Sequence, residues 1–89
     1  MSKYKSVQCP CCDYYSLSDK GEYSICKVCF WEDDGLDIDN MDTSSGPNRM
    51  TLQEGRANFK SFGACDKDML KNVEPISSRK NYKLEIRNI

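Results

Sequence analysis

The sequence predicts a small α+β fold, in which an antiparallel hairpin that carries cysteines packs against one main α-helix. Three observations predict it: Cys-x-x-Cys pairs at residues 9–12 and 26–29, strand-like segments beside them, and a strong helix signal over residues 52–62. A chain of 89 residues buries only a modest core, so a fold of this size often needs a metal or disulfides. We expect a hairpin-plus-helix domain over residues 1–76 and a polar, basic tail over residues 77–89 that can add an edge strand.

The expected hairpin is formed by two short segments, Tyr14 to Leu17 and Glu22 to Ile25. Residues 19–21 (Asp-Lys-Gly) lie between them and have turn chemistry. Residues 4–8 can form a further short strand that leads into Cys9. In this arrangement the hairpin brings the two cysteine pairs together.

The cysteine pairs are the strongest functional signal. Cys9 and Cys12 are followed, after thirteen residues, by Cys26 and Cys29, which matches a four-thiolate zinc ribbon with rubredoxin-like turns, or knuckles. A two-residue gap lets the chain turn so that both sulfurs reach one ion at about 2.3 Å. Asp13 follows the first knuckle, where a left-handed backbone is expected, and Asp tolerates that conformation better than most residues.

Four thiolates fill a tetrahedral site and leave no position for substrate, so the expected metal is structural. One zinc per chain is expected, and iron is the alternative because sulfur ligands alone do not exclude it. The sequence has no histidine and no recognisable catalytic motif, so we do not expect an enzyme. Cys11 should point away from the metal, as a bystander or as a reactive thiol, and Cys65 is expected to be a small buried hydrophobe.

The helix over residues 52–62 has signals at both ends. Thr51 can be its N-cap, Glu54 completes a capping box, and Gly63 is a suitable C-cap. Gly55 would allow close packing against the ribbon. The buried face is expected to contain Leu52, Phe59 and Phe62, with Ile25 and Phe30 or Trp31 opposite. Asp66 to Leu70 can form one more helical turn, and the alternation of apolar residues over 82–86 suggests a strand.

Two separate blocks of the sequence resemble the bacterial CPCC family of small cysteine-rich proteins. The first comprises Cys9-Pro-Cys-Cys-Asp-Tyr-Tyr15 and Ile25-Cys-Lys-Val-Cys-Phe-Trp-Glu-Asp-Asp-Gly35, and the second is the helical segment from Leu52 to Asp66. The resemblance extends from residue 9 to about residue 75. It implies the same ribbon, the same helix and zinc binding, and it implies no particular activity.

The distribution of charge along the sequence limits the classes of partner that the protein is expected to bind. The net charge is −1, yet residues 31–42 hold six acids and no base, whereas residues 43–89 hold nine bases and five acids. We therefore expect a protein-interaction module whose exposed acidic segment over residues 32–42 meets a basic protein partner. The expected contact residues are Trp31, Glu32, Asp33, Asp34 and Asp37.

Two alternatives stay open for these charges. The acids can pair internally with Arg49, Arg56, Lys60 or the basic tail, or the bases can bind nucleic acid as other zinc ribbons do. The balanced net charge makes nucleic acid the weaker interpretation. We find no apolar run typical of a signal peptide and no stretch that could span a membrane, so a cytoplasmic protein with reduced thiols is expected.

Overall fold

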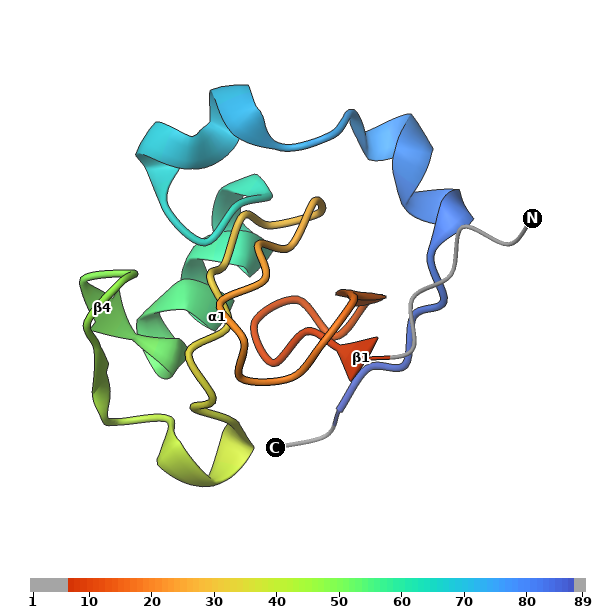
Figure 1. Ribbon diagram of the computed structural model, residues 1–89. Coiled ribbons are helices and arrows are strands. Elements are labelled where there is room, and N and C mark those ends of the chain that lie inside the picture. Colours follow the sequence, from red (N-terminus) through yellow and green to blue (C-terminus); the bar gives the residue numbers. More distant parts are fainter. Residues whose placement is uncertain (1–6, 88–89) are drawn as a thin grey trace.

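The computed structural model describes residues 7–87 of the chain and confirms a small α+β fold (Figure 1). It contains two separate two-stranded antiparallel sheets and one α-helix. The elements are β1 (Val7–Gln8), β2 (Tyr15–Leu17), the 3-10 helix η1 (Ile38–Asn40), β3 (Ser44–Ser45), β4 (Met50–Thr51), α1 (Leu52–Phe62), and the 3-10 helices η2 (Lys67–Asn72) and η3 (Ile76–Asn81).

The predicted hairpin is wrong in its second strand. β2 pairs with β1, with Val7 opposite Leu17, so the first cysteine pair lies in the turn of its own hairpin. The segment from Glu22 to Ile25 is not a strand, and only Ile25 forms an isolated bridge, with Glu32. This bridge closes a second hairpin around the second cysteine pair, which explains why the expected pairing with β2 does not form.

Helix α1 begins and ends where its local signals predict. The Thr51 side chain accepts a hydrogen bond from the Glu54 backbone N–H, and the Glu54 carboxylate accepts one from the Thr51 N–H, which completes the capping box. At the other end Gly63 has a φ of 96° and donates its N–H to Phe59. A left-handed φ suits glycine because it has no Cβ.

The core lies between the two knuckles and α1, and Trp31 is its largest fully buried side chain. Leu52 is buried as expected, and Trp31 rather than Phe30 packs against the helix. A Cβ on Gly55 would lie only 2.8 Å from Cζ3 of Trp31, so the glycine does allow the close packing that was predicted. The expectation for Ile25 is wrong, because its side chain is 44% exposed.

The remainder of the predicted helix face is less buried than expected. Phe59 and Phe62 are only half-buried, whereas Arg56, a residue that an apolar pattern does not select, is buried. Arg56 is buried because it pairs with Asp13 of the first knuckle, whereas Phe59 lies against Tyr14 and Arg79.

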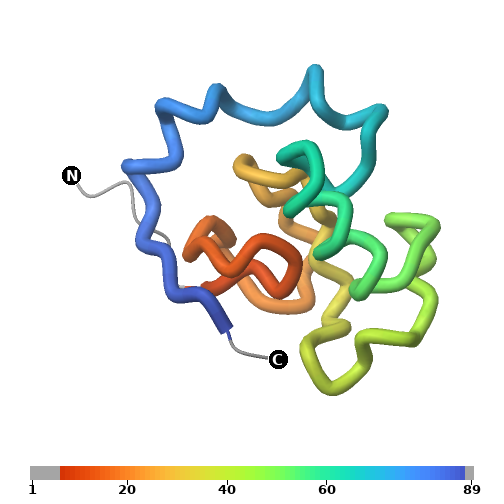
Figure 2. Tube along the Cα trace, turned by 180° about the vertical axis from the view of Figure 1, so that it is seen from behind, coloured from red at the N-terminus to blue at the C-terminus, as the bar shows by residue number. Residues whose placement is uncertain are grey.

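After α1 the chain runs around the periphery of the molecule and returns to the first hairpin (Figures 1 and 2). The helical turn predicted near residue 66 is present as η2, whose N-cap Asp66 accepts the N–H of Asp68. The strand predicted over residues 82–86 is reduced to one isolated bridge between Leu84 and Tyr14. Among residues 7–87, no helix has the length and apolar character needed to cross a membrane.

Candidate metal centre

The two knuckles repeat the same backbone geometry. In the first, the N–H of Asp13 donates to the carbonyl of Cys9 at 3.0 Å, and in the second the N–H of Phe30 donates to the carbonyl of Cys26 at 2.8 Å. Asp13 and Phe30 both have a φ of 70°, so the residue after each pair is left-handed. Asp tolerates this region, whereas it is unusual for a bulky side chain. Each knuckle therefore presents its two cysteines from the same tight turn.

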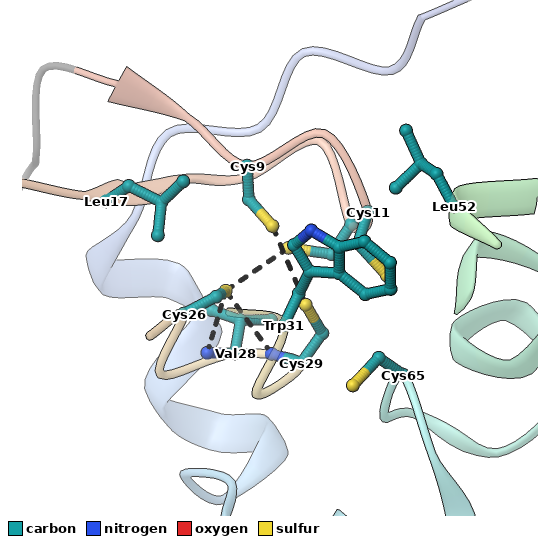
Figure 3. Packing of buried hydrophobic residues seen from close by; sticks show 10 residues of the cluster. Cys9, Cys11, Leu17, Cys26, Val28, Cys29, Trp31, Leu52 and Cys65 are labelled. Atoms are coloured by element: carbon teal, nitrogen blue, oxygen red, sulfur yellow. Dashed lines mark hydrogen bonds between the residues drawn. The ribbon is translucent and has the colours of Figure 1, made fainter. Parts of the chain in front are cut away.

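The four cysteines of the predicted site converge on one point, and Figure 3 shows three of them, Cys9, Cys26 and Cys29, turned toward one another. The sulfurs of Cys9 and Cys29 are 3.6 Å apart, as are those of Cys12 and Cys26, and all four sulfurs lie within 4.8 Å of one another. A tetrahedron with metal–sulfur bonds of about 2.3 Å has edges of about 3.8 Å. The separations greatly exceed a disulfide bond of about 2.05 Å. The group of four buried thiols can therefore hold a metal ion.

The four thiols differ in the hydrogen-bond donors that surround them. Sγ of Cys26 accepts the backbone N–H groups of Val28 at 3.3 Å and Cys29 at 3.4 Å, and Oγ of Ser16 lies 2.9 Å from it. Burial raises the pKa of Cys9 and Cys29. Burial also acts on Cys26, but hydrogen bonds from the neighbouring thiols and Ser16 outweigh it and lower its pKa. Backbone N–H groups thus point at the sulfur of Cys26, an arrangement that suits a thiolate ligand.

Two arginines hold the first knuckle, and neither of them was predicted to belong to the site. Arg56 binds Asp13 through two hydrogen bonds of 2.7 and 2.9 Å, and it donates to the carbonyl of Pro10 at 2.6 Å. Arg87 donates to Asp13 at 2.9 Å and to the carbonyl of Cys9 at 2.8 Å. Burial alone would raise the pKa of Asp13, but the hydrogen bonds from both arginines lower it. Asp13 therefore stays charged and ties α1 and the C-terminal segment to the metal-binding turn.

The other two cysteines lie beside the group of four but outside it. Sγ of Cys11 faces α1, 3.3 Å from the position that a Cβ on Gly55 would take. Cys65 donates its backbone N–H to the carbonyl of Cys29 at 2.8 Å. Burial, with the charges at Cys11 and Asp66, raises the pKa of Cys65 to about 12. Cys65 is therefore a small buried residue, as predicted.

The expected contact surface requires a correction at two residues. Trp31 and Asp33 are both 0% exposed, so neither is available to a partner. The Asp33 carboxylate accepts the backbone N–H groups of Gly21 at 2.7 Å and Gly35 at 3.3 Å. A buried carboxylate needs such partners. Asp33 therefore stabilises the backbone of the second hairpin and is not part of a contact surface.

The remaining predicted contact residues are partly used within the fold. Asp34 accepts a hydrogen bond from Oγ of Ser45 at 2.8 Å, and Asp37 forms ion pairs with Lys20 at 2.6 Å and Arg87 at 3.2 Å. Internal pairing with the basic tail, one of the two alternatives, is thus present at Arg87. Glu32 is half-buried and lines a hollow of about 350 Å³.

Comparison with known proteins supports the resemblance noted in the sequence. The family model described as cysteine-rich CPCC matches residues 7–80, which include both knuckles, α1, η2 and all of η3 except its last residue. No curated protein and no solved structure shows significant similarity to the chain. Because the family model covers most of the chain and contains the four convergent cysteines, the chain belongs to the cysteine-rich CPCC family.

Proposed function

We propose that this protein is a small zinc-binding module in which one ion per chain is structural. The observation that carries the proposal is the convergence of four buried sulfurs, two from each knuckle, with separations close to those of a tetrahedral thiolate site. The ion would join the two hairpins in the manner of a zinc ribbon with rubredoxin-like knuckles. Four protein ligands leave no open position, so the site stabilises the fold and performs no catalysis.

The metal is tested by elemental analysis of protein that has been purified without added metal. We expect about one zinc per chain and a colourless solution, whereas bound iron would give visible thiolate-to-iron absorption. Cys29→Ser should lose the metal, because it removes a ligand. Cys65→Ala is the matched control and should keep it. Folded wild-type protein without metal would contradict the proposal.

We further propose that the module acts in the cytoplasm by binding other proteins, and that it is not an enzyme. A closed metal site supports a scaffold role, and the exposed aliphatic side chains and hollows outside the metal centre support contact with a partner. Nucleic-acid binding is the second candidate. It is weakened by Arg56 and Arg87, because both guanidinium groups already bind Asp13.

The two candidates differ in their response to salt. Zinc-loaded protein is incubated with mixed DNA and RNA fragments, and in parallel with displayed random peptides. We expect peptide enrichment without a salt-dependent shift of the nucleic acid. A shift that weakens steeply with salt, as phosphate contacts require, together with no peptide enrichment, would contradict the protein-binding role.

A further inference from the structure

The C-terminal extended segment over residues 82–87 lies along one side of the first hairpin. The N–H of Tyr15 donates to the carbonyl of Lys83 at 2.8 Å, and the N–H of Glu85 donates to the carbonyl of Asp13 at 3.4 Å. These bonds make the segment the outermost strand-like element beside β2. An outermost strand has one edge that no neighbour covers.

The uncovered edge of this segment is formed by the backbone groups of Leu84 and Ile86. Backbone groups alternate in direction along an extended chain, so the N–H and C=O groups of these two residues point away from β2, and no residue within 7–87 bonds them. Their side chains, 43% and 77% exposed, line a mainly apolar cavity of about 180 Å³ together with Tyr14 and Phe59. A free backbone edge and an apolar cavity therefore share the same two residues.

A second cavity of about 260 Å³ adjoins the first along α1. Its lining contains no acid and consists of Met41, Gln53, Arg56, Ala57, Lys60 and Arg87, of which the three basic residues also line the first cavity. Arg56 and Arg87 belong to an ion-pair network of three cations and two carboxylates, so one positive charge is in excess. Lys60 is exposed and has no salt bridge within residues 7–87. The second cavity is thus electropositive.

The first cavity is lined by the first knuckle, α1 and the C-terminal segment, and the knuckle lies between the other two elements in both views (Figures 1 and 2). The cavity is therefore part of a groove with the knuckle as its floor and these two elements as its walls. Each cavity is smaller than the roughly 300 Å³ at which pockets for whole small molecules begin, and it suits a single side chain. An extended peptide places alternate side chains on one face, which matches two adjacent cavities beside a free edge.

We propose that this groove binds an extended segment of a partner protein by strand addition at Leu84 and Ile86. One apolar side chain of the segment enters the first cavity, and an acidic side chain two positions away meets Lys60 in the second. Main-chain hydrogen bonds supply affinity in such complexes, and the side-chain cavities supply specificity. The inference rests on the proposed protein-binding function and names the chemistry of the partner.

The test uses full-length, zinc-loaded protein and a library of displayed random peptides. We expect enriched peptides to carry an apolar and an acidic residue two positions apart. For a synthetic peptide of the enriched sequence, fluorescence anisotropy should show a loss of about tenfold in affinity with Lys60→Glu and a smaller loss with Lys60→Gln. Lys71→Glu on η2, an exposed lysine outside both cavities, is the matched control and should bind like wild type. Circular dichroism and zinc content check the fold of each variant.

Strand addition is tested on the peptide, so that the protein stays unchanged. N-methylation of the peptide backbone at the paired positions removes its donors, and it should abolish binding. The groove is refuted if enriched peptides are basic, if Lys60→Glu binds as tightly as wild type, or if a single-stranded oligonucleotide displaces the peptide. In those cases the protein still binds peptides, so the protein-binding function stands and only the proposed location and chemistry of the groove are wrong. If no peptide is enriched at all, the protein-binding function fails with it.

Discussion

Asp13 is the residue on which the first knuckle depends most. It adopts a φ of 70° directly after a cysteine of the metal centre and binds two arginines from distant parts of the chain. Its side chain is only 5% exposed, and that of Arg56 only 10%. An unpaired charge in such a place is strongly unfavourable, so each partner depends on the other.

Asp13→Asn is therefore expected to lower the free energy of unfolding by about 3–5 kcal/mol, because it leaves a buried guanidinium without its counter-charge. Asn tolerates the left-handed backbone, so the loss reports the charge and not the turn. The measurement is chemical denaturation of the zinc-loaded protein. Lys20→Gln breaks an exposed ion pair with Asp37 and should cost less than about 1 kcal/mol. Equal effects of the two substitutions would contradict this account.

Substitution of Gly55 gives a second prediction about a single residue. Gly→Ala in a helix normally stabilises by about 1 kcal/mol, but here the new Cβ would meet Trp31 at 2.8 Å. Overpacking of this kind costs about 1–3 kcal/mol, so Gly55→Ala should lower the melting temperature. Gly46→Ala, where a Cβ meets nothing within 4 Å, should change stability by no more than about 0.5 kcal/mol. A stabilised Gly55→Ala variant would show that the indole is not packed as described.

Among the elements, α1 was predictable from sequence because its signals are local. Thr51, Glu54 and Gly63 lie within the helix or next to its ends, and all three act as their spacing predicts. The four cysteines were predictable for the same reason, since each pair lies within one turn.

The N-terminal cap of α1 can be tested directly. Thr51→Ala removes the oxygen that accepts the Glu54 N–H at 3.1 Å, and it should cost about 1 kcal/mol of stability. Thr51→Ser keeps that oxygen and should cost little. Thermal melting followed by circular dichroism compares them, and if the two variants melt together, the cap contributes nothing measurable.

The hairpins and the arginine contacts could not be predicted because they depend on distant pairing. Strand-like composition in the segment before Cys26 does not reveal that Ile25 faces Glu32 instead of β2. Arg56 and Arg87 meet Asp13 across 43 and 74 positions of sequence. A single sequence holds no signal for contacts of this range. For Trp31 the sequence left two roles open, packing against the helix or contact with a partner, and the structure places it in the core.

At the scale of the whole molecule, the candidate metal centre and the core coincide. All six cysteines are buried, and the group of four lies next to Trp31 within one cluster that also contains Leu52 and Leu17. Few hydrophobic side chains lie elsewhere in the interior of the part of the chain that the structure describes. The proposed ion would thus supply much of the stability of the fold.

Removal of zinc by a chelator is accordingly expected to unfold the protein, since structural zinc in small domains contributes on the order of 10 kcal/mol. Fluorescence of Trp31 should shift to longer wavelength as the indole becomes exposed, and far-ultraviolet circular dichroism should lose the helix signal. Added zinc should restore both. Cys11 lies outside the ligand group, so the Cys11→Ala variant should unfold on chelation and recover with zinc as the wild type does. A chelated protein that keeps its native spectrum would refute a structural role for the metal.

The contact between Arg87 and the carbonyl of Cys9 spans 78 positions of the chain, and this has a consequence for how the protein is made. Synthesis adds about 5–20 residues per second, so the four cysteines leave the ribosome several seconds before Arg87 does. The nascent chain can load its ion and join the two knuckles while Asp13 still lacks one of its arginines. On the proposed metal site, the ion can therefore be captured before Arg87 is made, and the segment that carries Arg87 then closes against the first knuckle.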